Sequence, residues 1–340
     1  MKIAVYSAHD YDKKFLDSTG NGFQFVFIKD ALTLETAVLA KGCKGIAIFT
    51  SDNASANVLY ALKDIGIDFV VTRSTGFDHI DISIADKLNI HVANVPAYSP
   101  NAIAEHAVAM MLALSRKLVL SDKKVKEHDF TIDNLIGFNL DGKTAGIIGT
   151  GQIGGTTIKI LKGFGCKIVA YDIREDSRLV DEHGVEYVPL EVLYQNSDII
   201  SIHAPLNTYT TYLVNEKSIG LMKDGVMLIN TARGKIINTQ DILKAIKSGK
   251  IGYLGMDVYE NERGIFFKDF KGKIFSDELL QELMTFPNVL ITAHQAFLTN
   301  EALKNIADTT LFNINCFANN KANPNALNLN ISTRQQAEVH

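Results

Sequence analysis

Short runs of β-branched and aromatic residues alternate with segments of helical periodicity in the first hundred residues. The runs predict strands at 2–6, 24–28, 45–49, 69–72 and 91–94. Between these runs, the periodicity predicts helices at 36–40, 54–63 and 82–88. Apolar strands separated by helices are typical of βαβ units, in which helices cover both faces of a parallel sheet.

A proline-containing segment at 94–100 interrupts this alternation and favours an extended connector. Ser99 can cap the helix that follows, and Pro100 can occupy its first turn. The apolar pattern then predicts a long helix at 103–117. His106 falls inside it, where we expect a packing role.

A second alternation of strands and helices begins near residue 144. Its strands are expected at 144–148, 167–171, 198–202, 226–230, 253–257 and 289–292. A last helix is expected at 301–317, and the asparagine-rich tail at 319–330 is expected to form a loosely ordered strap. The pattern alone would place the last helix with either half of the chain.

Charge and composition bear on the partners that the chain can have. The 340 residues carry a net charge of −4, which gives no electrostatic basis for binding nucleic acid or an anionic membrane. No apolar run approaches the ~18 residues of a membrane span, and the first residues lack the apolar core of a signal peptide. The cysteines, Cys43, Cys166 and Cys316, are widely spaced and form no metal or redox motif. We expect a cytoplasmic protein without a metal site.

A glycine-rich segment marks the start of the second alternation. Gly149, Gly151 and Gly154 form a G-x-G-x-x-G pattern between an apolar strand and a helix. In that context the pattern predicts a dinucleotide site, with the pyrophosphate at the helix N-terminus. Asp172 ends the next strand, where a carboxylate can bind the ribose hydroxyls and would repel a 2′-phosphate. NAD is therefore favoured over NADP.

These observations predict an α/β protein with two Rossmann-like, doubly wound parallel-sheet domains and a cleft between them. We assign 1–98 plus about 299–340 to a flavodoxin-like substrate domain, which is the catalytic domain. We assign 99–298 to an NAD-binding Rossmann domain.

Three expected strands of the second domain run directly into residues that can carry out acid–base chemistry. Arg233 follows the strand at 226–230, Glu262 follows 253–257, and His294 follows 289–292. Ligands of an open parallel sheet bind beyond the carboxyl ends of its strands. A cation, a carboxylate and an imidazole are therefore expected together near the nicotinamide.

The same segments resemble the D-isomer-specific 2-hydroxyacid dehydrogenase family over essentially the whole chain. The T-x-R-G pattern at 231–234, the G-x-D-V-Y-E-x-E pattern at 255–262 and the H-Q-A-F pattern at 294–297 carry the resemblance. So do the segments at 73–78 and 95–100. The insertion containing Phe266 and Phe267 looks most like the branch of bacterial fermentative D-lactate dehydrogenases.

The resemblance implies a role for each matching residue. His294 would be the acid–base group, Glu262 would stabilise its protonated form, and Arg233 would bind the substrate carboxylate and polarise the keto oxygen. The substrate-binding residues would be Thr75, Gly76, Tyr98, Arg233 and Phe297. The cofactor-binding residues would be Gly149, Gly151, Gln152, Ile153, Gly154, Asp172, Ala204, Pro205, Thr231, Ala232, Arg233 and Asp257.

The implied activity is reversible hydride transfer from NADH to C2 of pyruvate, giving D-lactate. Two alternatives remain open: another 2-hydroxy acid of the same family's range, or an NAD-sensing corepressor or scaffold. Binding a phosphorylated substrate would require cationic side chains in addition to Arg73 and Arg233. We expect the apolar helix near 103–114 and the segment 118–140 to form the interface of a homodimer or a higher homo-oligomer.

Overall fold

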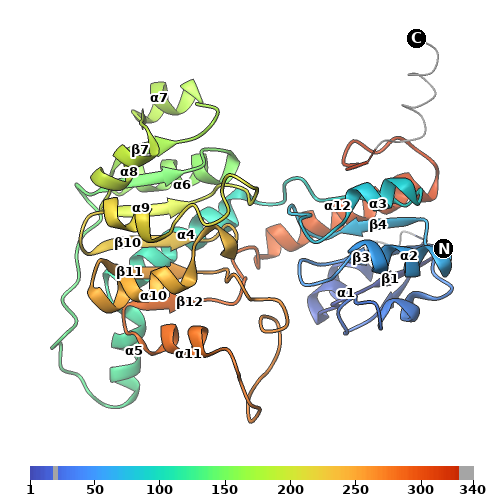
Figure 1. The fold of residues 1–340 in the computed structure, drawn as a ribbon, viewed down its shortest axis with the longest axis horizontal. Helices are drawn as coiled ribbons and strands as arrows, with labels where there is room; N and C mark the ends of the chain where they lie inside the picture. The colour runs from blue at the N-terminus through green and yellow to red at the C-terminus, as the bar shows by residue number, and fades with distance from the viewer. Residues whose placement is uncertain (18–21, 329–340) are drawn as a thin grey trace. The chain divides into compact units, whose positions relative to one another are not determined.

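The computed structural model describes residues 1–17 and 22–328, and the chain divides into two compact units (Figure 1). Unit 1 combines Met1–Ser99 with Leu298–His340, and unit 2 is Pro100–Phe297. The last helix therefore belongs with the N-terminal sheet. Among the described residues, no helix combines the length and the apolar character that crossing a membrane requires.

Unit 1 contains a parallel five-stranded sheet in the order β2-β1-β3-β4-β5, which is the flavodoxin-like order. The strands are β1 Lys2–Val5, β2 Gln24–Phe27, β3 Gly45–Ile48, β4 Phe69–Thr72 and β5 His91–Ala93. The helices are α1 Asp10–Asp17, η1 Ala37–Ala40, α2 Ala56–Asp64, α3 Ile82–Lys87 and α12 Asn300–Ala318. The expected helix at 36–40 is a 3₁₀ turn.

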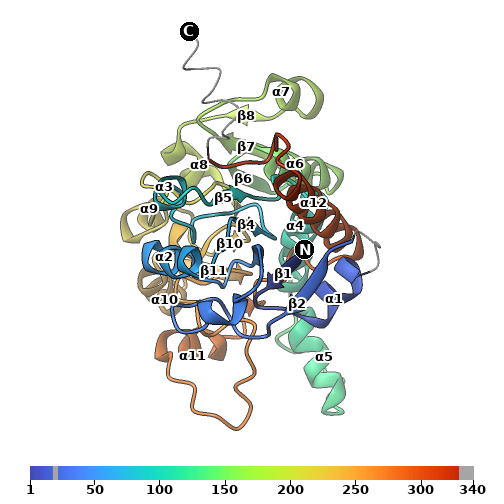
Figure 2. The ribbon, with the colours of Figure 1, turned by 90° about the vertical axis from the view of Figure 1, so that its right-hand side faces the viewer.

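Successive residues of each strand in unit 1 pack on opposite faces of the sheet. Ile3 and Val5 pack against apolar residues of α12, whereas Ala4 and Tyr6 belong to the cluster that includes α2 and α3. The two helical layers lie on either side of the sheet in Figure 2. This alternation explains why α12 joins unit 1: together with Leu16 of α1, its apolar face covers the strand residues that α2 and α3 leave uncovered.

The tail after α12 is more regular than expected. Ala326 pairs with Ala93 of β5 in an antiparallel bridge, and the Leu327 amide donates to the Val92 carbonyl at 2.8 Å. The Asn328 side chain accepts from the Val92 amide and donates to the Ile90 carbonyl, at 3.0 and 2.8 Å. Asparagine side chains thus hold the tail along the edge strand, where a loosely ordered strap was predicted. Residues 329 and 330 of that prediction lie outside the described residues.

Unit 2 contains a parallel seven-stranded sheet in the order β12-β11-β10-β9-β6-β7-β8. Its strands are β6 Thr144–Ile148, β7 Lys167–Tyr171, β8 Glu186–Tyr187, β9 Ile199–Ile202, β10 Val226–Asn230, β11 Ile251–Met256 and β12 Val289–Ile291. Its helices are α4 Pro100–Ser115, α5 Leu118–Lys126, α6 Gln152–Gly163, α7 Ser177–His183, α8 Leu190–Asn196, α9 Glu216–Leu221, η2 Gly234–Ile236, α10 Thr239–Ser248 and α11 Glu278–Thr285.

The strand order of unit 2 reverses between β6 and β9. From β6 the chain first builds outward to β8, and it then returns to add β9 on the other side. In an open α/β sheet, a ligand binds beyond the carboxyl ends of the strands at this switch point. The glycine-rich segment follows β6, so it lies at the switch point.

Most apolar side chains of the long helix α4 are buried within unit 2. Met110, Met111 and Leu114 pack in the cluster formed by one face of the sheet and α6. Most apolar side chains of α4 therefore complete this core, and the expected interface between subunits stays a prediction. The segment that follows it does expose large apolar side chains, on α5 and in the loop after it.

Candidate active site

The turn after β6 has the geometry expected of a dinucleotide loop. Gly149 adopts a φ of +90°, and a Cβ there would lie 2.8 Å from the Ala204 nitrogen, so only glycine fits. A Cβ on Gly154 would lie 1.9 Å from the Gly149 carbonyl oxygen, which shows how closely α6 approaches the turn. At Gly151 a Cβ would meet nothing within 4 Å, so the space beside this backbone is open. Gln152 and Ile153 begin α6, whose N-terminus opens at this turn.

Asp172 lies directly after β7 and is bound to the same turn. Its Oδ2 accepts from the Thr150 amide at 2.6 Å and from the Thr150 hydroxyl at 3.1 Å. Its Oδ1 accepts from the Arg174 amide at 3.0 Å. The carboxylate is thus held at the strand end beside the glycine turn, the position from which it was predicted to bind the ribose hydroxyls.

Two further strand ends of unit 2 carry residues of the predicted cofactor set. Ala204 and Pro205 follow β9, and Thr231 and Ala232 follow β10. Thr231 is 8% exposed, and its hydroxyl is buried without a hydrogen-bond partner in the described part of the chain. A buried hydroxyl left in this way fits a polar group of a bound ligand. The open space at Gly151 and the Thr231 hydroxyl together fit NAD.

Arg233 is held at the end of β10 by a residue that the sequence analysis did not identify. Asn230, which is fully buried, donates from its side-chain amide to the Arg233 carbonyl at 2.9 Å and accepts from the Ala232 amide at 3.1 Å. The Arg233 guanidinium donates to the Ala232 carbonyl at 2.7 Å. A Cβ on Gly234 would lie 2.1 Å from the Tyr259 backbone, so glycine brings the arginine loop against the segment leading to Glu262.

His294 and Glu262 form the central pair of the site. Nδ1 of the imidazole lies 2.8 Å from Oε1 of the carboxylate, and the side chains are 14% and 25% exposed. The second oxygen, Oε2, accepts from the Tyr259 amide at 3.0 Å, which fixes the carboxylate. An ionised carboxylate can only accept, so Nδ1 carries a proton and Nε2 is the nitrogen that can exchange one.

Asp257 holds the loop that carries His294. Its carboxylate is 1% exposed and accepts from the Gln295 and Ala296 amides at 2.8 and 2.9 Å. Its carbonyl accepts from the His294 amide at 2.7 Å. His294 itself has a φ of +53°, a left-handed conformation that non-glycine residues adopt only when their surroundings impose it. Asp257, predicted as a cofactor residue, thus also maintains this backbone.

His106 takes part in the same network, although a packing role was expected. The Thr292 hydroxyl donates to Asp257 Oδ1 at 2.5 Å, and His106 Nε2 lies 3.0 Å from that hydroxyl. Because the hydroxyl has one proton and gives it to the carboxylate, His106 Nε2 carries a proton toward Thr292, and this nitrogen also lies 3.5 Å from Asp257 Oδ1. A histidine on α4 therefore ends a hydrogen-bond network that reaches the loop of His294. The signal in the sequence was only a histidine in an apolar helix.

The expected substrate residues of unit 1 lie at loops after β4 and β5. Thr75 is exposed, and its carbonyl accepts from the Asn94 side chain at 2.8 Å. The Ser74 hydroxyl donates to the Gly76 carbonyl at 2.7 Å, so this loop is braced from within. The Tyr98 carbonyl accepts from Asn305 of α12 at 2.6 Å. Phe297, the last residue of unit 2, is 6% exposed.

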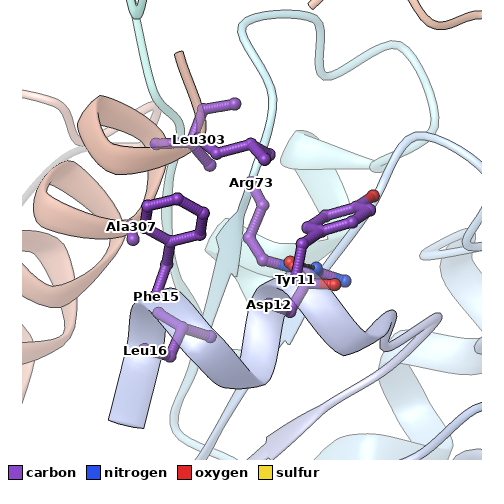
Figure 3. Close-up of a pocket in the computed structure, with 8 residues that line it drawn as sticks. Tyr11, Asp12, Phe15, Leu16, Arg73, Leu303 and Ala307 are labelled. Carbon is purple, nitrogen blue, oxygen red and sulfur yellow. Dashed lines mark ion pairs between the residues drawn. The ribbon is translucent and has the colours of Figure 1, made fainter. Parts of the chain in front are cut away.

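Arg73 precedes that loop and is not available as a surface cation. It is 2% exposed and forms an ion pair with Asp12 of α1, at the small pocket in Figure 3 that Phe15, Leu303 and Ala307 also line. The guanidinium also donates to the Tyr6 carbonyl at 2.5 Å. Arg73 thus ties α1 and the end of β1 to the start of the substrate loop. Removing one partner of such a buried pair costs about 3–5 kcal/mol.

The paired imidazole and carboxylate can hold and transfer one proton, and Arg233 can bind a carboxylate. Within the described residues, no group of three or more His, Cys, Asp or Glu side chains could hold a metal ion. A dinucleotide turn at the switch point, beside an acid–base pair, defines a dinucleotide-dependent oxidoreductase of the α/β class.

Comparisons with known proteins give the family. Residues 108–296 match the family model for the NAD binding domain of D-isomer specific 2-hydroxyacid dehydrogenases. The chain is 44% identical to the D-lactate dehydrogenase of Escherichia coli K12 over 329 residues, covering 96% of this chain and 100% of that one. It is 45% identical to a 2-hydroxyacid dehydrogenase homolog of Haemophilus influenzae over 316 residues, covering 92% and 95%.

A solved structure gives the same result for the fold. The structure titled as the pyruvate reductase of Chlamydomonas reinhardtii matches with a TM-score of 0.89 at 39% identity, covering 96% of this chain and 98% of that one. The chain belongs to the D-isomer-specific 2-hydroxyacid dehydrogenase family. It is an NAD-dependent oxidoreductase of that family.

Proposed function

We propose that this protein is a D-lactate dehydrogenase that reduces pyruvate with NADH and can run in reverse. The observation that carries the proposal is the 2.8 Å contact between His294 and Glu262, which follow β12 and β11, the two strands next in order to β10, after which Arg233 lies. The preference for pyruvate is supported by the names of the similar proteins from Escherichia coli and Chlamydomonas reinhardtii.

The roles of the residues follow from their hydrogen bonds. Glu262 engages Nδ1 of His294, so Nε2 gives its proton to the keto oxygen during reduction and takes it back during oxidation. Arg233 binds the substrate carboxylate through its planar fork of donors. When bound, NADH supplies the hydride for C2. Thr75, Gly76, Tyr98 and Phe297 are proposed to complete substrate binding, as the family resemblance implies.

The burial of Arg73 in an ion pair favours a small substrate without a phosphate group. A phosphorylated keto acid needs a second cation for its dianion. Arg73 is the arginine that the sequence offers near the substrate loop, and its charge is compensated by Asp12 in a buried ion pair. The proposal therefore excludes phosphorylated substrates and retains unphosphorylated 2-keto acids.

An assay of NADH oxidation across a series of keto acids tests the proposal. We expect the highest kcat/KM with pyruvate, lower values with hydroxypyruvate, glyoxylate and 4-methyl-2-oxopentanoate, and D-lactate as the product of pyruvate. His294→Gln should keep NADH binding and lose about 10²–10⁴-fold in kcat. A higher kcat/KM with the branched keto acid would move the protein to another specificity of the family. NADH binding without turnover of any keto acid would favour a sensor or scaffold.

The proposal includes a homo-oligomer and the cytoplasmic location expected from the sequence. We define the arm as residues 118–136, comprising α5 and the loop after it, which extends away from the sheet of unit 2 (Figures 1 and 2). Phe130, Ile132 and Ile136 are 73%, 80% and 86% exposed on this arm. Exposed apolar side chains so close together are typical of a protein interface. The arm also carries both lysines and carboxylates, which suits pairing with a second copy of itself.

A further inference from the structure

The insertion that begins at Glu262 has a structural role that the catalytic motif does not explain. It runs from Arg263 to the start of α11, and it contains the adjacent phenylalanines Phe266 and Phe267. The Glu262 carbonyl accepts from the Ile265 and Phe266 amides, both at 2.9 Å. The insertion therefore starts as a tight turn built on the catalytic carboxylate residue itself.

Phe266 anchors this turn in a small core. It is 8% exposed and packs with Tyr259 and Leu280 in a separate apolar cluster. The Tyr259 hydroxyl donates to the Asp277 carboxylate, with distances of 3.0 and 2.9 Å to its two oxygens. Asp277 also caps α11 through the Leu280 amide. The turn is thus anchored at Phe266, the residue directly before Phe267.

Phe267 is held in an unfavourable backbone conformation, and its ring faces the catalytic histidine. Its φ is +64°, in the left-handed region, which is unfavourable for a bulky side chain. Its ring centroid lies 6.0 Å from that of His294, with an angle of 38° between the planes. His294 is left-handed as well, at +53°. Two strained residues from different loops thus bring their rings together.

We propose that Phe267 is a positioning residue for the imidazole of His294. Glu262 fixes the imidazole through one atom, Nδ1, which leaves the ring free to tilt about that hydrogen bond. The Phe267 ring restricts this tilt, so Nε2 keeps a single direction, and it keeps water from the pair. The unfavourable backbone conformation of Phe267 is then the consequence of placing an aromatic ring beside His294. This inference rests on the proposed acid–base role of His294.

Substitutions at Phe267 separate this role from simple packing. Phe267→Leu keeps apolar volume but removes the ring, and Phe267→Tyr restores the ring. Phe267→Gly removes the ring and relieves the left-handed strain. Phe270→Leu is the matched control, because Phe270 lies in the same insertion and its ring packs on Phe275, at 5.4 Å between centroids.

We expect Phe267→Leu and Phe267→Gly to lower kcat for pyruvate about tenfold, because the acid is displaced from its productive position. The Kd for NADH should stay within about twofold of wild type in both variants. Phe267→Tyr and Phe270→Leu should retain most of the wild-type kcat. The unfolding midpoint of Phe267→Gly should equal or exceed that of wild type, which would show that lost activity is not lost folding.

A spectroscopic measurement checks the positioning directly. The Nδ1 proton shared with Glu262 should give a downfield proton resonance in wild type, and this resonance should broaden through exchange with water in Phe267→Leu. Unchanged kcat in an active enzyme, or an unchanged resonance, would overturn the inference. If the wild type itself reduced no 2-keto acid, the proposed function would fail instead, so the two failures are distinguishable.

Discussion

Nδ1 of His294 lies 2.8 Å from Oε1 of Glu262, although the two residues follow different strands of the sheet. The contact depends on the Tyr259 amide, which holds the other carboxylate oxygen, and on Asp257, which holds the loop of His294. Because an ionised carboxylate can only accept, the contact places a proton on Nδ1. The pair therefore leaves Nε2 as the nitrogen that can exchange a proton.

Glu262→Gln should lower kcat in both reaction directions. The amide can present an N–H as well as an oxygen to Nδ1 of His294, so it no longer requires Nδ1 to carry the proton and Nε2 to be the nitrogen that exchanges one. We expect kcat to fall at least about 10²-fold, with the Kd for NADH within about twofold of wild type. Both directions can be measured by NADH absorbance. An unchanged kcat would remove Glu262 from the catalytic set.

His106 gives a prediction about the hydrogen-bond chain behind the catalytic loop. His106→Leu removes the donor to Thr292, whereas His106→Gln keeps an N–H donor at a similar distance along the side chain. We expect the leucine variant to lose about tenfold in kcat with little change in the Kd for NADH, and the glutamine variant to lose less. Thr292→Val breaks the next link of the chain.

The double variant His106→Leu with Thr292→Val tests whether the two residues act together. If they form one chain to Asp257, the double variant should be no worse than the poorer single variant, because the second change breaks a chain already broken. Losses in kcat that multiply would instead indicate two independent effects, and His106 would then be a packing residue of α4.

Asp172→Asn removes the charge beside the glycine turn but keeps an oxygen that can accept from the Thr150 amide. The ratio of kcat/KM for NADPH to that for NADH should rise about tenfold, because the 2′-phosphate no longer meets a carboxylate. Asp176→Asn is the control, since Asp176 is a nearby carboxylate that caps α7. Equal ratios in wild type and Asp172→Asn would show that another residue selects the cofactor.

The sequence predicted the parts of this molecule that depend on local patterns. The predicted strands are apolar runs with few polar residues, and Arg233, Glu262 and His294 follow three strands that are consecutive in the sheet. Their convergence could be inferred because the carboxyl ends of parallel strands meet at one edge. The two-residue edge strand β8, Glu186–Tyr187, has no such run and was not predicted. The boundaries of strands differed by one or two residues, which local patterns do not fix.

The features that were missed depend on contacts between distant segments. Arg73 was counted as an available cation because α1, which supplies Asp12, is short and mostly polar and was not among the predicted helices. The role of His106 depends on α4 lying beside β12, and the asparagine-rich tail is ordered only because the edge of β5 accepts it. The two partners of each of these contacts lie far apart in the sequence, so a local pattern cannot predict them.

The arm gives a prediction about assembly. Ile132→Asp and Ile136→Asp place a charge on each copy of the proposed interface, so each substitution acts twice in a symmetric pair. We expect light scattering to show dissociation at a protein concentration at least about tenfold higher than for wild type. Ile274→Asp is the control, because Ile274 is 92% exposed but lies in the insertion. Unchanged assembly in both arm variants would mean that the oligomer forms elsewhere.

The last prediction concerns the effect of His203 on how the stability of the fold depends on pH. Its Nε2 lies 2.9 Å from the Ser201 hydroxyl. Burial lowers the pKa of His203 from 6.5 to about 4. The unfolded chain therefore binds a proton at this histidine before the folded chain does. The stability that neutral His203 contributes is present above pH 6.5 and is lost as the pH falls toward about 4, by roughly 3 kcal/mol in total.

His203→Gln keeps a polar partner for Ser201 but cannot be protonated. Between pH 6.5 and pH 4 its free energy of unfolding should fall less steeply than that of wild type, as measured by urea unfolding at a series of pH values. Other buried histidines and carboxylates contribute to both curves, so the difference between them isolates His203. His128→Asn is the control, because His128 is exposed and asparagine tolerates its left-handed φ of +62°. Its curve should follow that of wild type, and parallel curves for all three proteins would show that His203 is protonated in the folded state.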